Sequence, residues 1–273
     1  MILKRYVYFP TALEEFSPKQ FLKWVSLLLS FESGLANYHD LKTEFAAFLV
    51  KRRPNSKQLF FASQIFRLTE HLNFLFEEKE KEDKIELHPA TTIKNLLPKI
   101  KWYYGPSDAL QDITFLEYIH AYQYFQEFII EKEEQKLDLL CAALYHPKRY
   151  YFFGKRAIYD PEKAERRAKR FSKLPREIKF AVFYFFKSCD AYLREAKISI
   201  AGNEIDFGIL FKSSDDDQES DGLGMLGVLY KMAESGVFGN IKATAQENFW
   251  DVLLKLYQNH REYLNFKAKQ PKK

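Results

Sequence analysis

Apolar residues recur at helical spacing along most of this chain. The clearest stripe begins near Asp112 or Thr114 and consists of Phe115, Tyr118, Ile119, Tyr122, Phe125 and Ile129. A repeat of three or four residues places such side chains on one face of a helix. Similar stripes predict a helix beginning at Ser17-Pro18 and helices over about 40–51, 56–78, 137–145, 174–196, 223–235 and 244–264. The pattern predicts a mainly α fold, a bundle-like assembly of many helices.

Two segments have the alternation that is typical of β-strands. Residues 2–9 are rich in Tyr, Val and Phe, and they predict a short N-terminal strand that ends at Pro10. Apolar positions also alternate on both sides of Gly202-Asn203, which is a turn sequence. We therefore expect one minor β-hairpin near residues 198–211.

A run of mixed charge, residues 77–84, interrupts the helical pattern. Such runs are typical of a solvated helix end or a linker. We place a domain boundary just after it, which gives an N-terminal helical region of residues 1–87 and a helical main domain of residues 88–273. A length of 273 residues also fits a single domain.

Aromatic residues are unusually frequent, with 26 Phe and 17 Tyr against 3 Met. Aromatic surface supplies energy both in protein cores and at interfaces. The excess therefore fits a thick helical core, and it also fits docking of a partner or self-assembly through exposed rings. The two cysteines, Cys141 and Cys189, lie within apolar helical patterns, so we expect small buried side chains in a reducing compartment.

The sequence contains no recognisable catalytic or metal-binding motif. No Cys or His residues are paired at zinc-ligand spacing, and no nucleophile motif or P-loop occurs. We predict no catalytic, cofactor-binding or metal-binding residues, and no cofactor; an enzyme with a dispersed site of carboxylates is the third hypothesis. No stretch of about 18 uncharged apolar residues occurs, and the start lacks the features of a signal peptide, so we expect no membrane partner.

One glycine-rich segment, residues 222–227, matches the dinucleotide-binding pattern G-x-G-x-x-G. An acidic loop, residues 213–221, directly precedes it and would repel phosphate, and no alternation of strands and helices surrounds it. The same loop resembles half of a calcium-binding loop, but Val228 occupies the twelfth position, where a carboxylate is required. We interpret the segment as a solvated loop that leads into a helix; whether it binds a cation stays open.

The strongest polar signal is a basic arm, residues 148–179. It holds twelve Lys or Arg residues and four acids, an excess larger than the net charge of +5 for the whole chain. Tyr150, Tyr151, Phe152 and Phe153 lie within it. Basic side chains attract phosphates and aromatic rings stack on bases. The predicted residues for binding a polyanion or an acidic partner are Lys155, Arg156, Arg166, Arg167, Lys169, Arg170 and Lys173. Alternatively, Glu162 to Arg170 form a helix face that pairs with solvent or with an acidic protein.

Three groups of short motifs carry a resemblance to a known family. They are Tyr104-Gly105-Pro106 with Leu110-Gln111-Asp112-Ile113-Thr114-Phe115; Leu139 to Tyr145 with Lys173-Leu174-Pro175; and Ala233 to Asn240 with Asn248 to Leu253. Their order, over roughly residues 100–265, resembles uncharacterised proteins encoded among the tail genes of tailed bacteriophages and prophages. Some of these are similar to tail assembly chaperones, which hold the tape-measure protein during tail building.

The resemblance implies a non-enzymatic role in virion assembly or structure, in the host cytoplasm or in the virion. The expected partners are phage tail or other virion proteins, bound as helices through aromatic-rich surfaces, and a homo-oligomer fits as well. No functional residue follows from the resemblance, because such proteins act through surfaces. The alternative is a nucleic-acid-binding protein that uses the basic arm.

Overall fold

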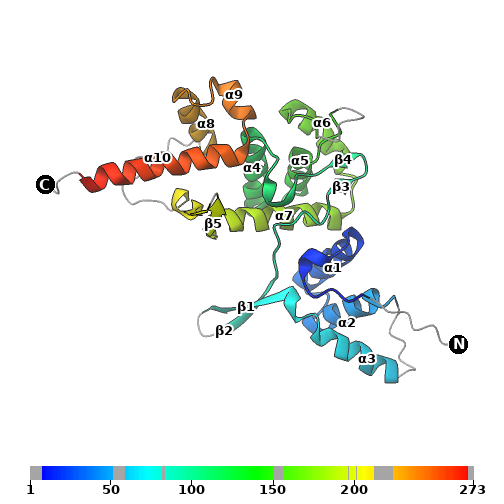
Figure 1. Cartoon of the computed structure of the whole chain (residues 1–273). Coiled ribbons are helices and arrows are strands. Elements are labelled where there is room, and N and C mark those ends of the chain that lie inside the picture. Colours follow the sequence, from blue (N-terminus) through cyan, green and yellow to red (C-terminus); the bar gives the residue numbers. More distant parts are fainter. Residues whose placement is uncertain are drawn as a thin grey trace. The chain divides into compact units, whose positions relative to one another are not determined.

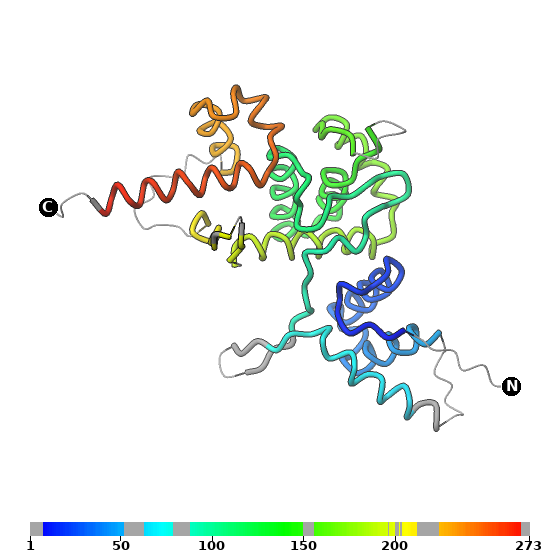
Figure 2. Tube along the Cα trace, in the orientation of Figure 1, coloured from blue at the N-terminus to red at the C-terminus, as the bar shows by residue number. Residues whose placement is uncertain are grey.

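The computed structural model describes residues 8–51, 59–81, 84–149, 156–195, 197–200, 202–211 and 224–269. These residues are mainly helical, which confirms the predicted mainly α fold (Figure 1). The chain forms two compact units, one of residues 1–97 with 175–185 and one of residues 98–174 with 186–273. In Figure 2 the described residues can be followed in colour along the trace. The boundary after residue 87 stays a prediction.

The first unit contains three helices, α1 (Pro18–Glu32), α2 (Tyr38–Leu49) and α3 (Leu59–Glu70). As predicted, α1 begins after Ser17: the Ser17 side chain accepts from the backbone of Gln20, and the Gln20 side chain accepts from the backbone of Ser17. Aromatic rings fill the core between the elements, with Trp24 about 5.5 Å from both Phe45 and Phe76.

The charge run forms a β-hairpin rather than a helix end or linker, so that prediction was wrong. Strand β1 (Phe76–Lys81) pairs antiparallel with β2 (Lys84–Pro89). Helix α3 ends at Glu70, and the hairpin is anchored where Leu75 and Phe76 are buried. A two-stranded ribbon can keep both faces in water, so a charged sequence does not prevent strand pairing.

The second unit is built from α4 (Phe115–Glu131), α5 (Glu134–Leu144), α6 (Pro161–Phe171), α8 (Met225–Glu234), α9 (Ile241–Gln246) and α10 (Phe249–Lys269). Helix α7 (Arg176–Glu195) contributes its residues from 186 onward. The rings of Tyr118 and Phe249 stack with centroids 3.9 Å apart, which joins α4 to α10. Cys141 and Cys189 are buried, as predicted, and no disulfide bond joins them.

Short strands and 3-10 helices complete the fold. Strands β3 (Lys99–Ile100) and β4 (Tyr103–Tyr104) form a two-residue hairpin. The hairpin predicted near 198–211 is present, as β5 (Lys197–Ile200) and β6 (Asn203–Asp206). The 3-10 helices cover Leu13–Glu15, Asn73–Leu75, Asp108–Leu110 and Phe207–Leu210. The predicted N-terminal strand lies largely outside the described residues, and residues 8–10 belong to no strand.

The helix predicted over 244–264 is interrupted, which corrects the sequence interpretation. Helix α9 ends at Gln246, and α10 begins at Phe249. Between them, the backbone N–H of Phe115 donates to the carbonyl oxygen of Glu247 at 2.9 Å, and that of Phe249 donates to Ile113 at 3.1 Å. Pairing with the segment before α4 thus replaces helical hydrogen bonds at this point.

Candidate functional site

Helix α6 has apolar residues on one side and mainly charged residues on the other. Asp160 caps its start by accepting from the backbone N–H of Lys163, and Pro161 occupies the first helical position. Ala164, Ala168 and Phe171 are buried. Helix α6 packs on α5 by this apolar side, so most of its charged residues face outward.

The structure divides the seven predicted binding residues into four groups. They are Lys155, Arg156, Arg166, Arg167, Lys169, Arg170 and Lys173. Lys155 lies outside the described residues, and Arg156 is buried. Arg167 is half-buried, and its Nη2 donates to the carbonyl oxygen of Ala142 at 2.9 Å. The other four are exposed.

Those four residues form what we name the α6 basic face: Arg166, Lys169, Arg170 and Lys173. The spacing of three and four residues places Arg166, Lys169 and Arg170 on one side of α6, and Lys173 follows two residues after the helix ends at Phe171. Arg166 lies 3.9 Å from exposed Glu162, a pair that costs little to separate. The face is therefore available to an external anion.

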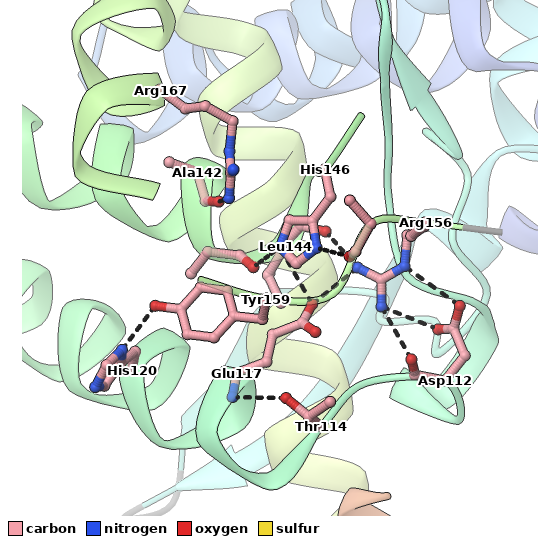
Figure 3. Close-up of polar contacts among 12 residues, drawn as sticks. Asp112, Thr114, Glu117, His120, Ala142, Leu144, His146, Arg156, Tyr159 and Arg167 are labelled. Atoms are coloured by element: carbon pink, nitrogen blue, oxygen red, sulfur yellow. Dashed lines mark hydrogen bonds and ion pairs between the residues drawn. The ribbon is translucent and has the colours of Figure 1, made fainter. Parts of the chain in front are cut away.

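Arg156 has a different role, and the structure corrects the prediction for this residue (Figure 3). Its Nη1 donates to Glu117 Oε1 and to the carbonyl oxygen of Leu144, both at 2.8 Å. Its Nε lies 3.3 Å from Asp112 Oδ2. The side chains of Arg156 and Glu117 are 8% and 3% exposed. Burial opposes the charge on Arg156, but Glu117 and Asp112 outweigh it and raise the pKa of the guanidinium.

His146 and Tyr159 lie beside this ion pair, and His120 lies beside Tyr159 (Figure 3). His146 Nδ1 lies 2.9 Å from the carbonyl oxygen of Ala157, and its Nε2 lies 2.6 Å from that of Ala143. The Tyr159 ring stacks on His146, and its hydroxyl lies 2.7 Å from His120 Nδ1. Burial lowers the pKa of both imidazoles, against the opposing effect of Glu117 on His146.

We assign this cluster a structural function. Glu117 and His146 are almost wholly buried, so a substrate has no direct access to them. The cluster links the segment after residue 155 to two helices, because Arg156 donates hydrogen bonds both to Glu117 of α4 and to the carbonyl oxygen of Leu144 of α5. That segment leads into the cap of α6, so the cluster sets where α6 begins.

No family model, characterised protein or solved structure matches this chain. Among the described residues, no three His, Cys, Asp or Glu side chains are grouped as a metal site would require. Within the same residues, no helix combines the length and apolar character needed to cross a membrane. The acidic loop 213–221 and the start of the glycine-rich segment lie outside the described residues.

One exposed feature was missed by sequence reasoning. No element was predicted for the segment from Lys99 to Tyr104, but it forms the β3–β4 hairpin beside α6 (Figure 1). Arg170 Nη1 donates to the hydroxyl of Tyr103 at 3.2 Å, and the Tyr103 ring meets the Phe171 ring at 4.9 Å. The signal in the sequence was the mixture of lysines and aromatic residues from position 99 to 104, which a search for longer basic runs overlooks.

Proposed function

We propose that this protein binds nucleic acid through the α6 basic face. The observation that carries the proposal is the exposure of Arg166, Lys169 and Arg170 on one side of a helix whose other side is fixed in the core, with exposed Lys173 just after the helix end. Phosphate contacts of this kind supply affinity without reading sequence. Since Arg156 is neutralised within the fold and Arg167 bonds to α5, fewer cations reach a ligand than the sequence suggests.

The test is a titration of a fluorescently labelled single strand by fluorescence anisotropy at several salt concentrations. We expect affinity to fall steeply between about 50 and 200 mM salt, because bound cations displace counterions. Replacing all four residues of the α6 basic face by Glu should weaken binding on the order of a hundredfold at low salt.

The matched control makes the same change in net charge elsewhere. It replaces four exposed lysines, Lys19, Lys51, Lys231 and Lys242, by Glu. If both variants lose affinity equally, net charge and not the α6 basic face is responsible. Unchanged binding in the α6 variant would remove the proposal.

A second candidate function is suggested by the other end of the second unit. Residues 261–268, the last turns of α10, are all exposed, and they include Tyr263, Leu264 and Phe266. Such an apolar stripe fits the groove of a helical protein partner. We infer from it, together with the resemblance described above, a role in phage tail assembly or virion structure. Recovery of an identified tail protein by the purified chain is the measurement that decides this candidate.

A further inference from the structure

Hydrogen bonds and packing fix the β3–β4 hairpin, and with it the turn, to neighbouring parts of the second unit. Ile100 is buried, and the N–H of Tyr104 donates to the carbonyl oxygen of His146 at 2.7 Å. The N–H of His146 donates in turn to the carbonyl oxygen of Tyr104 at 3.0 Å. Tyr103 is held by Arg170 and Phe171. These contacts mean that the turn residues are fixed in place before any ligand arrives, which lowers the entropic cost of binding.

The turn presents an indole ring to solvent. Trp102 is 79% exposed, whereas Trp24 is 1% exposed and Trp250 is half-buried with its Nε1 bonded to Ala109. A tryptophan is among the largest apolar side chains, and stable interfaces commonly use it as an anchor. Lys101, which precedes it, has a φ of 52°, a conformation that favours glycine. The chain therefore keeps a strained turn that displays a large apolar ring.

Lysine side chains lie in and next to the β3–β4 hairpin, which carries Trp102. Lys99 and Lys101 are exposed within the same hairpin. The Nζ atoms of Lys99 and Lys148 both lie over the ring of Tyr104, at 5.2 and 5.3 Å from its centre. Through Tyr103 the hairpin adjoins Arg170, so its positive charge continues into the α6 basic face.

We infer that Trp102 stacks on an unpaired base of single-stranded nucleic acid whose phosphates lie along the α6 basic face and the lysines of the hairpin. The inference rests on the proposed function and specifies its ligand. Stacking of bases on aromatic rings beside a basic track is the usual means of binding single strands. A duplex fits less well, because its base faces are covered by their neighbours.

An acidic protein is the main competing ligand, and the geometry favours it less. Helical partners are commonly bound in an apolar groove, whereas Trp102 stands on a narrow two-residue turn with lysines beside it. The flat indole ring of Trp102 beside lysine side chains is complementary to a flat base that lies beside a phosphate. We therefore commit to a single strand and leave the acidic protein as an outcome of the test.

The experiment measures binding of three labelled ligands to the full chain: a thymidine 15-mer, an abasic strand of equal length and a duplex. Replacing Trp102 by Ala should weaken binding of the thymidine strand about tenfold and leave the abasic strand unaffected, because only the former offers a base to stack on. The thymidine strand should also quench tryptophan fluorescence, and Trp102→Phe should abolish the quenching while keeping part of the affinity. Leu35→Ala, which changes a side chain that is 84% exposed in the other unit, is the control.

The outcomes separate the two proposals. If Trp102→Ala binds both strands like the unmodified protein, stacking is refuted while phosphate binding stands. If the unmodified protein binds neither strand, the proposed function itself fails. Poly-glutamate that binds as tightly as the thymidine strand, with the same loss in Trp102→Ala, would overturn the inference in favour of an acidic protein.

Discussion

At the scale of single residues, burial decides which charges of the basic arm can act on a ligand. Arg156 and Arg166 are both arginines in the same arm, yet only Arg166 is exposed. The arm's sequence does not distinguish them, because the partners of Arg156 are Glu117 and Asp112 on a distant stretch of chain. A count of charges therefore gives an upper limit on the cations available for binding.

The buried pair predicts a large effect of one substitution. Replacing Glu117 by Gln leaves the Arg156 guanidinium buried without its closest carboxylate, so we expect the free energy of unfolding to fall by about 3 kcal/mol. The measurement is denaturant unfolding of the full chain followed by circular dichroism. Glu162→Gln makes the same chemical change at an exposed pair, and it should leave stability unaltered. A similar midpoint for both variants would contradict a stabilising role for the cluster.

At the scale of elements, periodicity found the long helices, and local chemistry found several of their ends. Ser17 and Pro18 gave the start of α1, and Thr114 was one of two proposed starts for α4, which it caps. Failures occurred where pairing with another segment outweighed local preference. The charged run became a hairpin, and α9 and α10 are separated by a β-bridge between Thr114 and Asn248.

The exposed end of α10 predicts a specific loss of partner binding. Replacing Tyr263, Leu264 and Phe266 by Ser should abolish recovery of a tape-measure or other tail protein from a host lysate, as identified by mass spectrometry, because it removes the apolar stripe. The control replaces Tyr230, Val237 and Ile241 by Ser, which are also exposed apolar residues of the second unit. Equal recovery by both variants would count against docking on α10.

At the scale of the whole molecule, the aromatic excess is used mainly inside the two units. The core of the first unit includes the rings of Trp24, Phe45 and Phe76. The core of the second unit includes those of Tyr118 and Phe249. The thick-core interpretation therefore accounts for most described rings, and only a few, such as Trp102 and Phe266, remain for contacts outside the chain.

Two histidines, buried His146 and half-buried His120, make overall stability depend on pH. Burial lowers the pKa of His120 and of His146 below the ordinary value of 6.5. Between the lowered pKa and about 6.5 the unfolded chain binds protons that the folded chain does not, so acid favours unfolding. We expect the free energy of unfolding to decrease from about pH 7.5 to about pH 5.5.

The check is a series of denaturant titrations across that range. His146→Gln should reduce the dependence on pH, and His39→Gln, a change at an exposed histidine, is the control. An unchanged pH dependence in His146→Gln would show that this imidazole is not among the groups responsible.

The sequence by itself determined the helical class, the cap of α1, the β5–β6 turn and the burial of both cysteines, because periodicity and capping act between residues close in the chain. Only the tertiary structure decided that Arg156 is neutralised by Glu117, that the β3–β4 hairpin adjoins α6, and that Trp102 remains exposed beside lysines. These facts depend on contacts between distant segments, and burial is a property of the assembled unit that no local pattern contains.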